Sequence, residues 1–295
     1  MLKRSRSFIK KYLKKGSTVY SILNRIDKIN RHTLPCVYSF IRVQSPVMKL
    51  FGPLYPRSRK IIALDITYRC HVGCLNCNRS VGKGQAPTNE EMTVEQIQRF
   101  VQESVDKKVK WGSIHVVGGE PTLHPQLFEI LEVLIQYKQH YSPDTKIDIY
   151  TSGYGEKVMS ILSQVPNEIA IVNSSKESKV QLHYPFNMAP KDSLLYKYAD
   201  YANGCWIGSN CGMGLTPYGY YACSLAGGID RIFGLNKGKK TLPSPTDPML
   251  DDLRPFCQLC GHFRCASFTY KSPMSQTWKV GYENYRKNRP NLSWY

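Results

Sequence analysis

Apolar and polar positions follow two different rhythms along this chain. Residues 1–31 place apolar side chains at helical spacing between basic ones. Residues 34–54 are apolar only in patches, interrupted by Pro35, Pro46 and Pro53. From residue 60 onward, short apolar runs alternate with longer amphipathic stretches. The pattern predicts a helical N-terminal extension with no membrane-spanning segment, followed by an α/β domain.

Five apolar runs have the length and composition of buried strands. They cover residues 61–67, 113–117, 146–150, 168–172 and 180–183. Helices are expected from Thr93, where Thr93 and Gln96 fit a capping box, over about 125–139, between the third and fourth strands, and after the fifth. Such alternation is typical of parallel strands with crossover helices, so we predict an α/β fold, a partial (β/α)6 TIM-like barrel of about six strands.

Composition divides the chain into three predicted segments. Residues 1–59 form a basic amphipathic N-terminal extension, and residues 60–202 form the partial barrel. Residues 203–295 are rich in Gly, Tyr and Cys and contain a hairpin-like pattern at 216–221. We expect this last segment to be a small cysteine-rich domain held together by metal.

The net charge of +18 is concentrated near the N-terminus, where residues 1–32 carry ten Lys and Arg against one acid, Asp27. One interpretation is a solvated face, and another is binding of residues 1–31 to an anionic membrane surface. Nucleic acid is the less favoured partner, because no RNA-binding module is visible.

No export signal is expected, because basic residues such as Lys3 and Arg4 interrupt every apolar run near the N-terminus. We therefore predict a cytoplasmic protein that can also bind peripherally to the inner face of the membrane. Its ten cysteines are expected to be reduced and to serve as metal ligands rather than cross-links.

The first predicted strand is followed by Cys70, Cys74 and Cys77 in a Cys-x3-Cys-x2-Cys loop. Three thiolates in one short loop can hold an iron–sulfur cluster and leave one iron open to another molecule. A structural zinc site would need a fourth ligand, for which His71 is the nearby candidate.

This loop after a first strand resembles the signature of the radical S-adenosylmethionine (radical SAM) superfamily, over roughly residues 60–200. The resemblance is strengthened by Gly118, Gly119, Glu120 and Pro121 at the end of the second strand, which are similar to the motif that binds the cofactor's methionine amino group. It implies a 4Fe–4S cluster, S-adenosylmethionine, a reductant such as flavodoxin or ferredoxin, and a 5′-deoxyadenosyl radical.

Further cofactor contacts are implied by the same resemblance. Ser152 closes the third strand, and Asn173 and Ser175 close the fourth, where similar enzymes place polar groups, although such short runs are also common in plain turns. Asn76 precedes the third cysteine, where the superfamily usually has an aromatic residue near the adenine.

Six cysteines near the C-terminus form a second group. They are Cys205, Cys211, Cys223, Cys257, Cys260 and Cys265. Their pattern resembles the shortened "twitch" form of the SPASM domain, which implies a second 4Fe–4S cluster. By this analogy the ligands are Cys205, Cys223, Cys257 and Cys260, with a set beginning at Cys211 as the alternative; a zinc ribbon is the other interpretation.

The two spare thiols, Cys211 and Cys265, are candidate hydrogen-atom donors. The predicted reaction removes a hydrogen atom from a small polar or sugar-like substrate and leads to oxidation or epimerisation. The alternatives are peptide maturation by epimerisation or cross-linking, RNA or nucleotide modification, and a zinc-binding scaffold without activity.

Overall fold

The computed structural model describes residues 34–176, 183–203, 205–266, 269 and 271–295. The basic segment 1–31 and its expected membrane contact lie outside the described residues. Across the described ranges, no helix combines the length and apolar character needed to cross a membrane.

The described residues form one six-stranded sheet in the order β4-β3-β2-β1-β5-β6. The strands are β1 (Ile61–Thr67), β2 (Ser113–Gly118), β3 (Lys146–Thr151), β4 (Ala170–Asn173), β5 (Met213–Thr216) and β6 (Gly219–Tyr221). All neighbouring pairs are parallel except β5 and β6, which form an antiparallel hairpin. The predicted α/β class, with a partial barrel-like parallel sheet, is confirmed.

The strands that complete the sheet come from a different part of the chain than expected. The predicted hairpin forms, and its strand β5 pairs in parallel with β1, so the cysteine-rich segment adds strands to the barrel sheet itself. Of the predicted strand at 180–183, residues 180–182 lie outside the described residues. His183 makes an isolated antiparallel bridge with Thr269.

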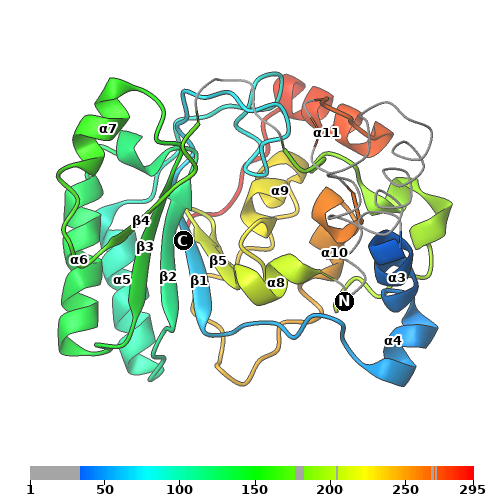
Figure 1. Ribbon diagram of the computed structural model, residues 1–295, viewed down its shortest axis with the longest axis horizontal. Coiled ribbons are helices and arrows are strands. Elements are labelled where there is room, and N and C mark those ends of the chain that lie inside the picture. Colours follow the sequence, from blue (N-terminus) through cyan, green and yellow to red (C-terminus); the bar gives the residue numbers. More distant parts are fainter. Residues whose placement is uncertain (1–33, 177–182, 204, 267–268, 270) are drawn as a thin grey trace, which may run out of the picture.

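Helices α5, α6 and α7 lie along one side of the sheet, and α8 to α11 gather beyond β5 (Figure 1). Their bounds are α5 Val94–Asp106, α6 Leu127–His140, α7 Glu156–Leu162, α8 Trp206–Asn210, α9 Ala226–Phe233, α10 Arg254–Cys257 and α11 Gln276–Lys287. The predicted capping box is present: Thr93 Oγ1 accepts from Gln96 N at 3.2 Å, and Gln96 Oε1 accepts from Thr93 N at 3.0 Å.

The helix expected after the fifth strand is absent from the described part of that region. Residues 183–203 contain instead two short 3-10 turns, η3 (Pro190–Asp192) and η4 (Leu194–Tyr196). Pro185 and Pro190 explain the difference, because proline lacks the N–H that a continuing helix needs.

The two faces of the sheet have different chemistry. Alternate positions such as Ile62, Leu64 and Ile114 are fully buried and belong to the core formed with α5 and α6. The intervening positions point the other way because side chains alternate along a strand. That inner face carries polar residues, and the carboxyl ends of its parallel strands meet at one edge.

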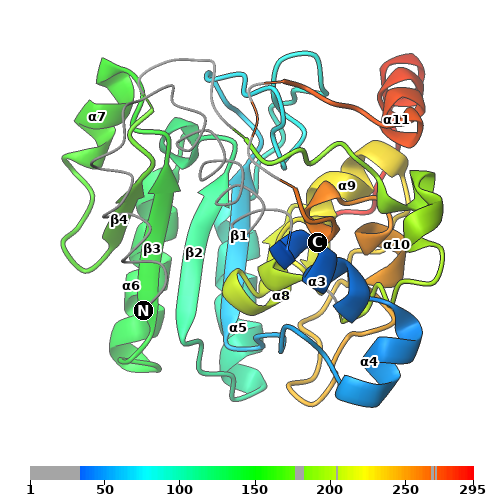
Figure 2. The same ribbon diagram turned by 45° about the vertical axis from the view of Figure 1, so that its right-hand side comes forward.

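Two further helices, α3 (Leu34–Arg42) and α4 (Ser45–Phe51), precede the sheet. Both views place them far from β4, among the helices of the C-terminal half (Figures 1 and 2).

Candidate active site

The loop that follows β1, residues 70–77, gathers three cysteine side chains and is called the cluster loop below. Burial raises the pKa of the Cys70 thiol, and the neighbouring thiols of Cys77 and Cys74 raise it further. Burial also raises the pKa of Cys74, against the opposing charge of Lys176. The ammonium of Lys176 donates to Cys74 Sγ at 3.2 Å. Three neighbouring thiols with a cation beside one of them form a donor set that suits an iron–sulfur cluster.

The end of β2 lies against the cluster loop because it carries two glycines. A Cβ at Gly119 would lie 2.2 Å from Arg69 O and 3.0 Å from Cys70 Cβ. Its backbone N–H donates to Thr67 O at 2.7 Å. Gly118 has φ of 145°, a conformation that side-chain-bearing residues rarely adopt. The two predicted motifs are therefore in direct contact, and a side chain at Gly119 would displace the loop.

The carboxylate of Glu120 joins the ends of β2 and β3. Glu120 is fully buried and accepts hydrogen bonds from Thr122 Oγ1 at 3.0 Å and Thr151 Oγ1 at 2.7 Å. It also accepts from Ser152 N at 2.8 Å and Ser152 Oγ at 2.5 Å. Pro121 then begins the short turn η2 (Pro121–Leu123). The predicted site residues Glu120 and Ser152 are thus brought together, with their side chains bonded to each other.

The remaining predicted cofactor residues lie apart from this contact. Asn173, the last residue of β4, and Ser175, two residues further on, are exposed, and Ser175 N donates to Asn173 Oδ1 at 2.7 Å. Asn76 is buried, and its amide donates to Lys271 O at 2.7 Å. Within the described residues, Asn76 Oδ1 is buried without a hydrogen-bond partner. The contacts of these three residues with a cofactor stay a prediction.

The sheet's inner face carries polar residues that sequence reasoning missed. His115 Nε2 lies 3.5 Å from Asp148 Oδ2, and the His115 ring lies 5.0 Å from the ring of Tyr150. Nearby on β1, Asp65 Oδ1 accepts from Arg79 Nε at 3.0 Å. The name inner polar face is used below for Asp65, His115, Asp148 and Tyr150. A signal existed in the sequence, since each interrupts an apolar strand at an alternate position.

Burial controls the protonation of this face. It lowers the pKa of His115, with Asp148 opposing the shift, so the imidazole is held toward its neutral form. It raises the pKa of Asp65, with Arg79 opposing. A neutral imidazole beside a carboxylate is the arrangement that a general base requires.

Cys211 is a half-buried cysteine of the C-terminal group. It caps α8, and burial raises the pKa of its thiol while Arg79 opposes the shift. Although burial lowers the pKa of Arg79, Asp65 and then the thiols of Cys77 and Cys211 raise it. Burial, with a smaller contribution from Cys211, raises the pKa of Cys223. Cys211 is free in the structure, and its role as a spare thiol stays a prediction.

The four cysteines that the sequence predicted as one ligand set line one pocket, called the four-cysteine pocket. They are Cys205, Cys223, Cys257 and Cys260. Burial raises the pKa of Cys205 to about 12 and holds those of Cys257 and Cys260 well above their ordinary value, with the other thiols adding to the shift. Arg57, from the N-terminal extension, also lines this pocket.

Four thiols that line one apolar pocket, two of them buried and two half-buried, are a soft donor set of the kind that iron–sulfur clusters use. In the described ranges, no three His, Cys, Asp or Glu side chains are arranged to hold a single metal ion. Metal binding would release the protons that burial keeps on these thiols.

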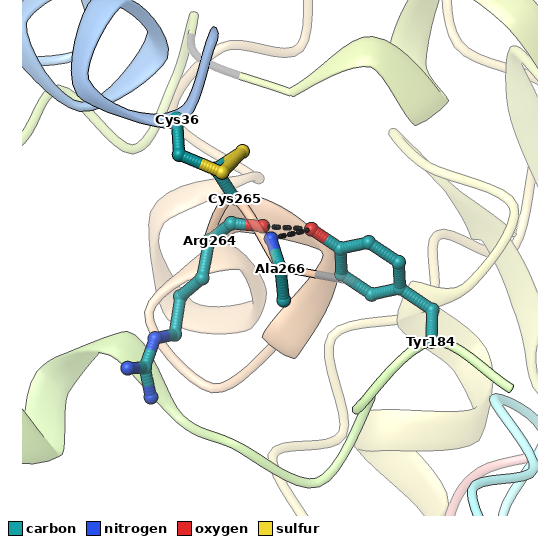
Figure 3. Close-up of a disulfide and its surroundings, with 5 residues drawn as sticks. All are labelled: Cys36, Tyr184, Arg264, Cys265 and Ala266. Atoms are coloured by element: carbon teal, nitrogen blue, oxygen red, sulfur yellow. Dashed lines mark hydrogen bonds between the residues drawn. A yellow bond between two sulfur atoms is a disulfide. The ribbon is translucent and has the colours of Figure 1, made fainter. Parts of the chain in front are cut away.

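Cys265 does not fit the expected role of a spare thiol. It forms a disulfide with Cys36 of α3, with Cα atoms 5.0 Å apart (Figure 3). Next to this disulfide, Tyr184 Oη donates to Arg264 O and accepts from Ala266 N at 2.7 Å. The expectations that Cys265 can donate a hydrogen atom and that all cysteines are uncrosslinked are therefore wrong in this structure, because a disulfide sulfur carries no S–H.

Residues 64–173 match the family model of the Radical SAM superfamily. The match runs from β1 to the end of β4 and so includes the cluster loop and the glycine-rich end of β2. It does not extend to the four-cysteine pocket.

Part of the chain is similar in sequence to two curated relatives. It is 31% identical over 91 residues to molybdenum cofactor biosynthesis protein 1 of Drosophila melanogaster, which is 31% of this chain and 15% of that protein. It is 25% identical over 100 residues to GTP 3',8-cyclase of Campylobacter jejuni subsp. doylei, which is 34% of this chain and 29% of the relative. The chain thus spans less than a third of the length of each relative.

Among solved structures, BtrN in complex with AdoMet and 2-DOIA aligns with a TM-score of 0.40 and 15% identity, covering 72% of this chain and 96% of that one. SuiB of Streptococcus suis bound to S-adenosylmethionine aligns with a TM-score of 0.29 and 17% identity, covering 42% of this chain and 27% of that one.

Proposed function

We propose that this chain is a radical SAM enzyme that oxidises a small polar or sugar-like substrate by removing a hydrogen atom from carbon, and the match of residues 64–173 to the Radical SAM superfamily supports the proposal. One observation carries the proposal. Arg79, two residues beyond Cys77, joins the three parts of the site. It pairs with Asp65 of the inner polar face at 3.0 Å. Its Cα would lie 3.3 Å from a Cβ at Gly228 of α9, the helix whose Ala226 and Ile229 line the four-cysteine pocket.

In this proposal Cys70, Cys74 and Cys77 hold a 4Fe–4S cluster, and a flavodoxin or ferredoxin supplies its electron. With S-adenosylmethionine, the cluster supplies a 5′-deoxyadenosyl radical that takes a hydrogen atom from substrate carbon. The carboxylate of Glu120 already accepts four hydrogen bonds. We therefore expect the methionine amino group to meet backbone carbonyls of Gly118 and Gly119.

To be oxidised, an alcohol must lose a hydrogen atom from carbon, a proton from oxygen and one further electron. His115 accepts the proton, because its imidazole is held toward the neutral form and Asp148 at 3.5 Å can orient it and stabilise its charged form. The four-cysteine pocket would hold a second 4Fe–4S cluster, which would supply the acceptor for the electron. The product is then two hydrogens lighter than the substrate.

Epimerisation is the competing outcome at the same site. It needs a thiol that returns a hydrogen atom to the opposite face of the substrate radical, and Cys211 is the remaining candidate. The inner polar face favours oxidation, because epimerisation by a thiol needs no proton acceptor such as His115.

The deciding experiment uses anaerobic protein with a reductant, S-adenosylmethionine and a panel of cyclitols, amino sugars and short peptides. Oxidation gives a product two hydrogens lighter, and Cys211→Ala should retain product and iron. The matched variant Cys223→Ala should lose about four irons per chain and the product, while S-adenosylmethionine cleavage continues. A product of unchanged mass that carries one deuterium from heavy water, and that disappears in Cys211→Ala, would overturn oxidation in favour of epimerisation.

Nucleotide modification is a second candidate, favoured by the names of the curated relatives, which include a GTP 3',8-cyclase. If it is correct, GTP should be consumed under the same conditions, and the sugar-like panel should be unchanged. The short matched region, about a third of this chain, makes this the weaker candidate. Colourless protein that contains zinc and no iron would instead support a zinc-binding scaffold.

A further inference from the structure

Large apolar side chains that face solvent are concentrated in two short segments. Of sixteen such exposed side chains in the described residues, nine lie in α3, α4 and residues 194–198, which begin with the turn η4. They are Leu34, Val37, Tyr38, Ile41, Leu50, Phe51, Leu194, Leu195 and Tyr198. Several are almost fully open, with Leu194 at 89% and Leu50 at 75% exposure. This set is called the apolar patch.

The three elements of the apolar patch adjoin one another. Ser45 N, at the start of α4, donates to Tyr198 O at 2.8 Å. The rings of Phe40 and Tyr196 lie 5.6 Å apart and join α3 to η4. Arg42 of α3 lies over the ring of Phe51, 5.5 Å from its centroid, and so joins α3 to the end of α4. The exposed side chains thus belong to one continuous region of the molecule.

Helix α3 has an apolar stripe with no partner in the described structure. Leu34, Val37, Tyr38 and Ile41 follow the i, i+3, i+4, i+7 spacing of a single helix face. None of the nine residues of α3 is buried. Apolar patches of this kind usually mark an interaction site, because water contact with them is unfavourable.

Charge identifies the kind of partner. Residues 34–51 contain Arg42 and Lys49 and no acid, and the whole stretch 1–60 carries fifteen Lys and Arg against one Asp. Beside η4, Lys191 and Lys197 are exposed. The acids of the same segments are Asp192 and Asp200, two against the four basic side chains Arg42, Lys49, Lys191 and Lys197. A second copy of the chain would bring like charges together, whereas an anionic surface would complement them.

We propose that the apolar patch docks this protein on an anionic lipid surface. The exposed Leu, Ile and Phe side chains enter the boundary between headgroups and acyl chains, and Tyr38 and Tyr198 lie at headgroup level. The surrounding Lys and Arg side chains attract acidic headgroups. This proposal does not depend on the enzymatic reaction, and it extends the predicted membrane contact of residues 1–31 to a surface that the structure describes.

The test measures co-sedimentation of the full chain with vesicles of phosphatidylcholine alone or with about one third phosphatidylglycerol. We expect binding to the acidic vesicles only, weakened by salt. Leu194→Ser combined with Leu195→Ser should lower the affinity roughly tenfold, and Leu50→Ser with Phe51→Ser should do the same. Phe128→Ser with Met159→Ser is the matched control, since these side chains are 43% and 49% exposed on α6 and α7, outside the patch.

All variants should keep the wild-type iron content and circular dichroism, which separates lost docking from lost folding. S-adenosylmethionine cleavage should also be unchanged, so failure of the reaction and failure of docking are distinguishable. Equal vesicle binding by patch variants and wild type would overturn the proposal and leave the basic N-terminal residues as the contact. A dimer in solution that the patch variants convert to monomers would also overturn it, with a second copy as the occupant.

Discussion

At the scale of single residues, the candidate site separates into groups that the sequence revealed and groups that it concealed. The cysteines were found because thiol spacing within a short loop is a local property of the chain. His115 and Asp148 were not found, since their meaning depends on the pairing of β2 with β3, which sets His115 opposite Asp148. A single histidine within a predicted strand does not by itself indicate a function.

A pH profile of His115 tests its role as a proton acceptor. Burial lowers the pKa of this imidazole below its ordinary 6.5. The base is therefore neutral at pH 6.5 and above, and the rate of oxidation should be independent of pH in that interval. Oxidation should fall as the pH drops through the lowered pKa. The unfolded chain binds the proton more readily, so the histidine's contribution to stability is also lost as the pH falls below about 6.5.

The variant His115→Gln should slow product formation by about 10² to 10⁴-fold, with S-adenosylmethionine cleavage and iron content retained. Asp148→Asn should give a smaller loss, because it removes only the group that orients the imidazole. His140→Gln, on the exposed side of α6, is the control and should behave as wild type. Unchanged product rates in His115→Gln would remove this residue from the mechanism.

At the scale of elements, local signals predicted structure well where they were complete. The strand at 61–67 and the capping box at Thr93 were found as predicted, because a continuous apolar run and a Thr-to-Gln spacing each specify their element locally. The helix expected after the fifth strand failed where Pro185 and Pro190 interrupt the chain. Long-range pairing was harder, since nothing local indicates that β5 joins the sheet beside β1.

The contact between the end of β2 and the cluster loop yields a prediction about packing. Gly119→Ala puts a methyl group where Arg69 O lies 2.2 Å away, so the loop must move. We expect the variant to lose about four irons, those of the first cluster, and to stop cleaving S-adenosylmethionine. Gly112→Ala is the control, because Gly112 precedes β2 at the end opposite the cluster loop, and the nearest atom to its new Cβ would be Lys60 O at 3.3 Å. Full iron content in Gly119→Ala would mean that the loop accommodates the methyl group.

At the scale of the whole molecule, the sequence predicted the parts better than their connections. The boundary expected at 202/203 separates a barrel from a cysteine-rich segment, yet the hairpin of that segment completes the barrel sheet. Arg57, from the expected N-terminal extension, lines the four-cysteine pocket and donates to Ala222 O at 2.5 Å. Such contacts join residues more than a hundred positions apart, so they have no local pattern that sequence reasoning could use.

The disulfide between Cys36 and Cys265 links two residues at a sequence separation of 229. A cross-link that closes so long a loop restricts the unfolded chain and should stabilise the folded one by about 2–4 kcal/mol. Cys36→Ala should therefore lower the free energy of unfolding, measured by denaturant titration of the oxidised protein. A reductant should bring wild type to the same value and leave Cys36→Ala unchanged. After removal of metal, labelling should count eight free thiols in the unreduced wild type, as in the structure. Ten labelled thiols would show that the bond does not form in solution and would return Cys265 to the set of available hydrogen-atom donors.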